Sequence, residues 1–306
     1  MTESLRDAYL AARAVRPANR AILTPALVAA AGLAIGVIQG CAGQPPVGSP
    51  QPPTLEEAQG VTYRGLTDLD GAVTVAPRLI ITGDLDGDDV PEAVVHVAAS
   101  SSGTGTWNHL AVLARRDGGV QNIATTALGD RVALRGVRIS EGILHADVVR
   151  AGAGDPRCCP GELMDLSWRL VGTVLEPATV RPAGRLTLEV LAGPTWVLTG
   201  WTMNDAAPPE PAITLRLEAG RVSGSSGCNT YTASATPGDL PGDVSIDPPA
   251  STRMACPGQA GVVEARWLAQ LSRVRSFGFM LGEMVLTYDT DGGADVMRFR
   301  RDDQAR

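Results

Sequence analysis

The amino-acid sequence predicts an α+β protein that is mostly antiparallel β and is divided into two small domains. Aromatic residues make up only 4% of the chain, while 35 glycines and 22 prolines favour short strands and many turns. Residues 61–175 contain short apolar or alternating runs that are bounded by Gly and Asp. Residues 186–300 read as strands, one amphipathic helix and further strands, an order typical of a helix packed on an antiparallel sheet.

The first 40 residues have the composition of an export signal. Four arginines precede an apolar run, AILTPALVAAAGLAIGVIQGC, which ends at Cys41. A basic region followed by an apolar region is typical of a signal peptide, which is absent from the mature, folded protein. The run spans about 18 residues, so its length alone also fits an uncleaved membrane anchor.

The end of this run resembles the lipobox of bacterial lipoproteins, in which a small residue precedes a cysteine that is lipidated. Ile38 and Gly40 fit that pattern, whereas Gln39 departs from it. The resemblance implies cleavage before Cys41, a lipid on its sulfur, and attachment to the extracytoplasmic face of the cell membrane. Residues 41–60 are rich in Pro, Gly and Gln, which predicts a tether.

The predicted first domain, residues 61–175, consists of short strands. RLIITGDLDG, EAVVHVAAS, HLAVLARRDGG and GILHADVVRAG are each apolar or alternating, and DGG at 117–119 is a tight-turn signal. Through its GDLDGD and GDPRCCP segments this domain resembles an N-terminal domain of exported lipoproteins. Residues 176–185, EPATVRPAGR, predict a linker.

The predicted second domain, residues 186–300, opens with strand-like runs that include TWVLTGW and GRVSGSSGCNTYTAS. GVVEARWLAQLSRVRSF predicts an amphipathic helix, because its apolar residues recur at about one helical turn: Val263, Trp267, Leu271 and Val274. GFMLGEMVLTYDTDGGADVMRFRR predicts a closing hairpin, and residues 301–306 form a tail.

This second domain resembles the META domain family, which includes the bacterial HslJ proteins. The resemblance is carried by TWVLTGW (195–201), GRVSGSSGCNTYTAS (220–234) and STRMACPG (251–258). The combination of GCN-x-Y with a later T-x-M-A-C before a helix is specific. The resemblance implies a compact sheet with one packed helix in an exported bacterial protein, a link to stress tolerance, and no enzymatic activity.

Cys228 and Cys256 are candidates for a structural disulfide. A cysteine nucleophile needs an activating base, and all three histidines of the chain lie in the first domain. Two cysteines without a nearby histidine are also a poor zinc site. Besides Cys41 the mature chain has four cysteines, an even number that allows three pairings in an oxidising compartment. We favour a Cys228–Cys256 disulfide over two buried free thiols.

Cys158 and Cys159 leave three alternatives open: a vicinal disulfide, a thiolate pair for Cu(I), or cross-pairing to the second domain. Neighbouring cysteines bond only when the intervening peptide is distorted. Copper needs further ligands, and the sequence does not place His109 or His145 near the pair. We favour a structural disulfide over a metal site.

An acidic loop, ITGDLDGDDVPEAVV, places carboxylates at relative positions 1, 3, 5 and 9: Asp84, Asp86, Asp88 and Glu92. Oxygens that alternate in this way can wrap one Ca²⁺ ion. The pattern differs from an EF-hand, since position 6 is Asp89 rather than Gly and position 12 is Val95. The alternative is an ordinary turn between strands, for which Asp and Gly are preferred.

The function predicted from these patterns is a non-enzymatic binding, scaffold or envelope-stress role, with no catalytic residues and no cofactor. A net charge of −7 argues against nucleic acid as a partner. We expect the membrane, through the lipid anchor, and an envelope protein or small ligand as partners. The alternative is a metal-binding module, with Ca²⁺ in the acidic loop or copper on the adjacent cysteines. The candidate binding surface of the second domain consists of Trp196, Trp201, Asn229 and Tyr231, and core packing is the alternative role for the tryptophans.

Overall fold

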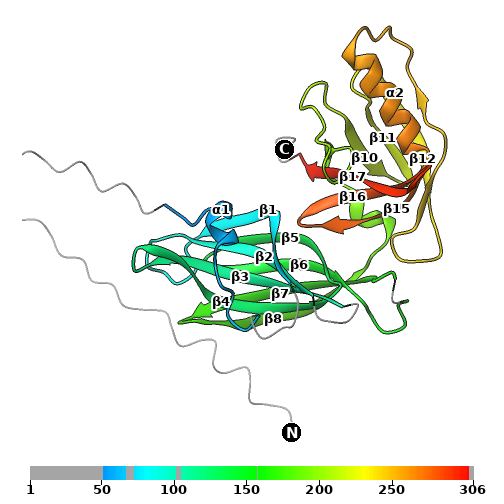
Figure 1. Cartoon of the computed structure of the whole chain (residues 1–306). Coiled ribbons are helices and arrows are strands. Elements are labelled where there is room, and N and C mark those ends of the chain that lie inside the picture. The colour runs from blue at the N-terminus through cyan, green and yellow to red at the C-terminus, as the bar shows by residue number, and fades with distance from the viewer. Residues whose placement is uncertain (1–50, 67–71, 101–104, 157, 303–306) are drawn as a thin grey trace, which may run out of the picture. The chain divides into compact units, whose positions relative to one another are not determined.

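Antiparallel strands dominate the computed structural model, which describes residues 51–66, 72–100, 105–156 and 158–302 (Figure 1). The predicted signal peptide, the lipobox and Cys41 lie outside the described residues, as does most of the predicted tail. The described residues all belong to one compact unit. Within the described part of the chain, we find no helix that is long and apolar enough to cross a membrane.

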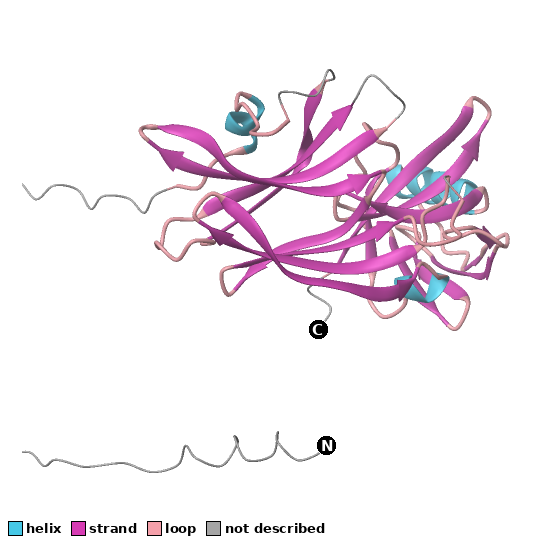
Figure 2. Cartoon of the chain, turned by 90° about the horizontal axis from the view of Figure 1, so that it is seen from below, coloured by secondary structure: helices cyan, strands magenta, loops and turns pink. Residues whose placement is uncertain are grey.

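Two four-stranded meanders build the first domain and face each other across a shared core (Figure 2). Within each sheet, each strand pairs with the next one in sequence. At the turn between β3 and β4, Asp117 and Gly118 both have positive φ angles, 52° and 80°, as a two-residue hairpin turn requires. The predicted DGG turn is therefore confirmed. The strands are β1 (Val73–Gly83), β2 (Glu92–Ser100), β3 (Thr106–Arg116) and β4 (Gly119–Asp130) in one sheet, and β5 (Ala133–Ser140), β6 (Ile143–Arg150), β7 (Glu162–Val171) and β8 (Val174–Arg185) in the other.

The predicted tether is partly wrong, because its second half contains a short helix, α1 (Leu55–Gln59). Thr54 caps this helix by accepting a hydrogen bond from the Glu57 backbone, and the Glu57 side chain accepts one from the Thr54 backbone. This reciprocal pair is a capping box, which TLEE encodes. Ala58 is fully buried against the outer face of the first sheet.

The predicted linker is also wrong, since residues 176–185 belong to strand β8 and pair with β7. β8 is an edge strand of its sheet and is exposed along nearly its whole length. An edge strand tolerates proline because one side of its backbone needs no partner in the sheet. Pro177 and Pro182 therefore lie in a regular edge strand, although their presence made the segment resemble a linker in composition.

The second domain is one curved sheet of nine strands whose ends approach each other. The order is β13-β12-β11-β10-β9-β17-β16-β15, with β14 beside β12. Asp243, next to β13, bridges to Ser276 of β15, and the Phe277 backbone donates a hydrogen bond to the Gly242 carbonyl over 2.8 Å. A 3-10 helix, η1 (Leu188–Leu191), precedes β9 (Trp196–Gly200), β10 (Thr214–Glu218), β11 (Arg221–Ser225), β12 (Thr230–Pro237), β13 (Val244–Ile246), β14 (Ala250–Ser251), β15 (Val274–Met280), β16 (Glu283–Thr290) and β17 (Gly293–Arg301).

The predicted amphipathic helix is α2 (Gln259–Leu271), which packs on this sheet (Figure 1). Trp267 is fully buried, and its ring meets the rings of Tyr231 and Phe299 edge-on at centroid distances of 5.5 and 5.9 Å. The helix is shorter than predicted, because Val274 belongs to β15 and not to α2. Val274 keeps the spacing of a helical turn, but its backbone pairs with Tyr288 in the sheet.

Candidate functional site

Residues 226–229 of the GSSGCNTY segment form the tight turn between β11 and β12. The Asn229 carbonyl accepts a hydrogen bond from the Ser226 backbone over 2.8 Å, and the Ser226 Oγ atom also lies 2.8 Å from this carbonyl. Gly227 has a φ of 94°, a left-handed conformation that favours glycine. The turn therefore fixes the direction in which Cys228 leaves the sheet.

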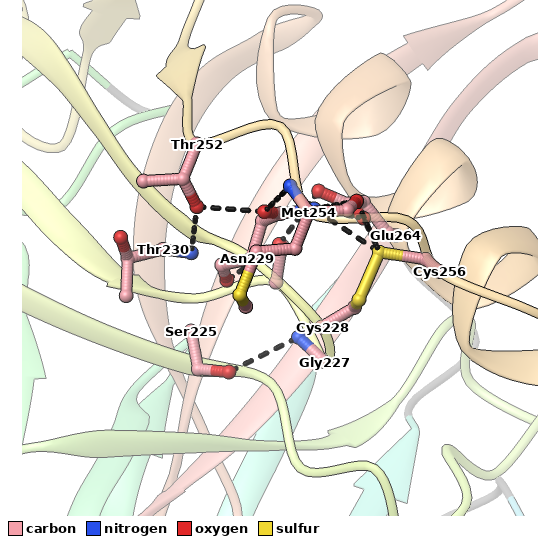
Figure 3. Close-up of a disulfide and its surroundings, with 10 residues drawn as sticks. Ser225, Gly227, Cys228, Asn229, Thr230, Thr252, Met254, Cys256 and Glu264 are labelled. Carbon is pink, nitrogen blue, oxygen red and sulfur yellow. Dashed lines mark hydrogen bonds between the residues drawn. A yellow bond between two sulfur atoms is a disulfide. The ribbon is translucent and has the colours of Figure 1, made fainter.

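A disulfide joins Cys228 to Cys256, so the favoured pairing is confirmed. The two Cα atoms lie 6.0 Å apart, within the usual range for a disulfide. Cys256 precedes α2 by three residues, and the bond therefore ties the β11–β12 turn to the start of the helix (Figure 3). The two cysteines are 28 positions apart in the sequence. Closing a loop of that length stabilises the fold by about 3–4 kcal/mol in the chain-entropy estimate.

Asn229 reinforces the same connection with its side-chain amide (Figure 3). Its Oδ1 accepts hydrogen bonds from the Thr252 hydroxyl at 2.7 Å and from the Met254 backbone at 2.8 Å. Its Nδ2 donates to Oε2 of Glu264 at 3.0 Å. Because one amide serves as donor and acceptor at once, neither a carboxylate nor an aliphatic side chain can replace it.

Glu264 of α2 is buried beside the disulfide, with only 9% of its surface exposed. Its Oε1 accepts a hydrogen bond from the Ser226 hydroxyl at 3.0 Å. Its Oε2 lies 2.9 Å from Sγ of Cys256. The side chains of the turn, the pre-helix segment and the helix thus converge on one point.

The predicted binding surface of the second domain is not exposed. Trp196, Trp201, Asn229 and Tyr231 are each at most 4% exposed. Trp196 donates its indole hydrogen to the Leu191 carbonyl at 2.9 Å. Trp201 follows the end of β9, so strand alternation does not set its direction, and the Arg266 guanidinium covers its ring at 4.5 Å. These side chains form the core, where their large area is removed from water.

The acidic loop lies between β1 and β2, and it brings three of its four predicted carboxylates together. One oxygen each from Asp84, Asp86 and Asp88 lies within 4.8 Å of the others. Glu92 is not in this group, since it is 2% exposed and accepts a hydrogen bond from the Leu85 backbone at 2.8 Å. Burial and the neighbouring carboxylates raise the pKa of Asp86, and burial raises the pKa of Glu92.

Cys158 and Cys159 are bonded to each other in the segment between β6 and β7. A disulfide leaves neither sulfur as a thiolate for copper. Among the described residues, neither His109 nor His145 belongs to a metal-binding cluster with these sulfurs. The favoured structural disulfide is therefore the arrangement found.

Sequence reasoning missed an open cavity of 550 Å³ between the first sheet and the β15–β16 hairpin. It forms where β1 bulges away from β2, between Val75 and Ile80. The hairpin approaches β5 there, and the Gly282 backbone donates to the Leu134 carbonyl at 3.0 Å. Most of the wall is apolar, including Ala76, Ala98, Val132, Leu134, Phe279 and Leu281.

His96 and Asn108 are polar members of this wall, 7% and 8% exposed. Asn108 donates its amide to the Thr106 carbonyl, which directs its Oδ1 toward Nε2 of His96 at 3.0 Å. Nε2 therefore carries the hydrogen, and Nδ1 is a buried acceptor without a protein partner. Burial lowers the pKa of His96 and keeps the ring neutral at neutral pH.

A curved antiparallel sheet with one packed helix and a disulfide between them defines the class of the second domain. Residues 187–303 match the family model of the META domain, and this part of the chain is a META domain. No curated protein gives a significant match. Among solved structures, the chain is similar to the NMR structure of a protein from Burkholderia xenovorans at 27% identity, covering 38% of this chain and 86% of that one. The TM-score is 0.30, which adds nothing to the fold assignment.

The lowered pKa of His96 predicts a pH-dependent part of the stability. Below the ordinary pKa of 6.5 the unfolded chain binds a proton that the folded chain does not, so this part is lost as pH falls. The difference in unfolding free energy between the wild type and His96→Gln should shrink between about pH 7.5 and pH 5. Urea unfolding at several pH values measures it, and the exposed Ser140→Ala serves as the pH-independent control. A constant difference would contradict this assignment.

Proposed function

We propose that the protein is a membrane-anchored lipoprotein whose folded part binds a small, mainly apolar ligand without catalysis. The observation that carries the binding role is the cavity between the first sheet and the β15–β16 hairpin. Its 550 Å³ fall in the range typical of small-molecule sites, and apolar walls with a few polar groups are typical of them too. His96 and Asn108 are buried polar side chains in that wall.

An extracytoplasmic location and a role in the cell envelope form the second part of this proposal. The Cys228–Cys256 disulfide supports it, because such bonds persist in oxidising compartments. The lipobox-like sequence before Cys41 supplies the anchor. The META domain supports a stress-related role by resemblance.

The cavity predicts saturable binding of the apolar dye phenylnaphthylamine to the unit from Gly48 to Arg306, with one dye per chain. Ala98→Trp places a large ring in the cavity and should abolish the fluorescence increase of the dye. Val262→Trp, on the exposed face of α2, should leave it unchanged. Circular dichroism checks that each variant is folded. Equal dye binding by both variants would count against a ligand site in the cavity.

The lipid anchor predicts a defined mass for the protein from the membrane fraction. The mass should correspond to a chain that begins at Cys41 and carries lipid. Four cysteines should resist alkylation until the protein is reduced, because all four are bonded in pairs. A full-length chain without lipid would reject the anchor and leave the cavity proposal standing.

Calcium binding at the acidic loop is the second candidate function, favoured by the convergence of Asp84, Asp86 and Asp88. Calorimetry with Ca²⁺ should then give saturable heat, and Asp86→Asn should weaken binding at least about tenfold because the site loses one anionic ligand. Asp117→Asn, in the exposed β3–β4 turn, is the matched control. Absence of heat with the wild type rejects this candidate.

A further inference from the structure

Among the residues that the structure describes, the hydrogen-bond donors to the buried carboxylate of Glu264 are neutral groups. The Ser226 hydroxyl and the Asn229 amide donate to it, each over 3.0 Å. None of the ion pairs among the described residues includes Glu264. A carboxylate removed from water without a cation is costly, and a bound cation would offset this cost.

Two sulfur atoms lie beside this carboxylate (Figure 3). One oxygen of Glu264 and the Sγ atoms of Cys228 and Cys256 are all within 4.8 Å of one another. Both cysteines are only partly buried, so a reductant or an ion can approach from solvent. While the sulfurs are bonded to each other they carry no anionic charge. After reduction they become two thiols next to a fixed carboxylate.

We propose that the reduced form of this site binds one zinc ion through the thiolates of Cys228 and Cys256 and the carboxylate of Glu264. Three protein ligands with a water in the fourth position are a known zinc arrangement. Thiolates favour zinc over the harder Ca²⁺ and Mg²⁺ ions. Asn229 donates to Glu264 and would orient this ligand, as groups behind the direct ligands do in other zinc sites.

The step that opens the site is a thiol–disulfide exchange with a dithiol reductant. One thiolate of the reductant attacks a sulfur of the Cys228–Cys256 bond, which forms a mixed disulfide and releases the other cysteine as a thiolate. The second thiolate of the reductant then attacks the reductant sulfur of this mixed disulfide and releases the remaining cysteine. The reductant leaves as a disulfide, and the protein gains two electrons and two protons as two thiols. Zinc binding then displaces these two protons to solvent.

Zinc would preserve the connection that the disulfide makes. Its three ligands come from the β11–β12 turn, from the segment before α2 and from α2 itself. A metal bound to all three would hold the helix start against the turn when the covalent bond is open. The Cys158–Cys159 pair differs, since no third ligand joins it among the described residues.

The test uses the full chain in detergent with Cys41→Ser, Cys158→Ser and Cys159→Ser, so that only the META pair remains. The chain is reduced with a phosphine, which is then removed, and Co²⁺ is added as the spectroscopic probe. One Co²⁺ per chain should give a thiolate-to-cobalt charge-transfer band, and Zn²⁺ should remove it. The same chain before reduction should give no band.

Glu264→Gln in this background separates the proposed site from a simple thiol pair. It should weaken cobalt binding at least about tenfold, whereas the exposed Glu218→Gln should not change it. Near-ultraviolet circular dichroism monitors the fold of the reduced chain. The proposal is overturned if no band appears after reduction, if Glu264→Gln binds as the background does, or if the band appears only in chains that have lost their tertiary signal.

Discussion

The connection between the β11–β12 turn and the start of α2 is the constraint on which the META domain depends. Helix α2 buries one face against the sheet. The contacts at the N-terminal end of the helix fix the position of this face on the sheet. The disulfide and the Asn229 amide set it together, one by a covalent bond and the other by hydrogen bonds to residues 252–254. Tyr231 lies two residues beyond Asn229, so the same turn also places the ring that Trp267 contacts.

Local signals in the sequence predicted the elements well where the signal and the tertiary structure agree. The strand-rich class, the turn at Asp117 and the helix around Trp267 are examples. Val274 shows the limit of periodicity. An apolar residue three positions after Leu271 fits the next turn of a helix, but here it begins strand β15. Pro177 and Pro182 show another limit: composition alone does not separate a linker from an exposed edge strand.

The parts of the site that depend on residue types and on short segments of the sequence could be predicted, and the contacts between distant segments could not. An even number of cysteines and the missing nearby base indicated the disulfide at Cys228. The partners of Asn229 lie 23 to 35 residues away, so no local pattern could reveal them. The cavity is harder still, since it needs a bulge in β1 and a hairpin some 200 residues later in the chain. A binding role was predicted for Trp196 and Trp201 because large aromatic rings are common both in binding surfaces and in cores, and the sequence alone does not separate the two.

The prolines of the edge strands have a further consequence for the whole molecule. Pro77 lies in the bulge of β1, and Pro177 and Pro182 lie in β8, so each four-stranded sheet has proline in one outer strand. A residue without a backbone N–H cannot join a neighbouring chain by a regular ladder. If an anchor concentrates many copies on one surface, these residues would hinder strand pairing between copies at the β1 and β8 edges.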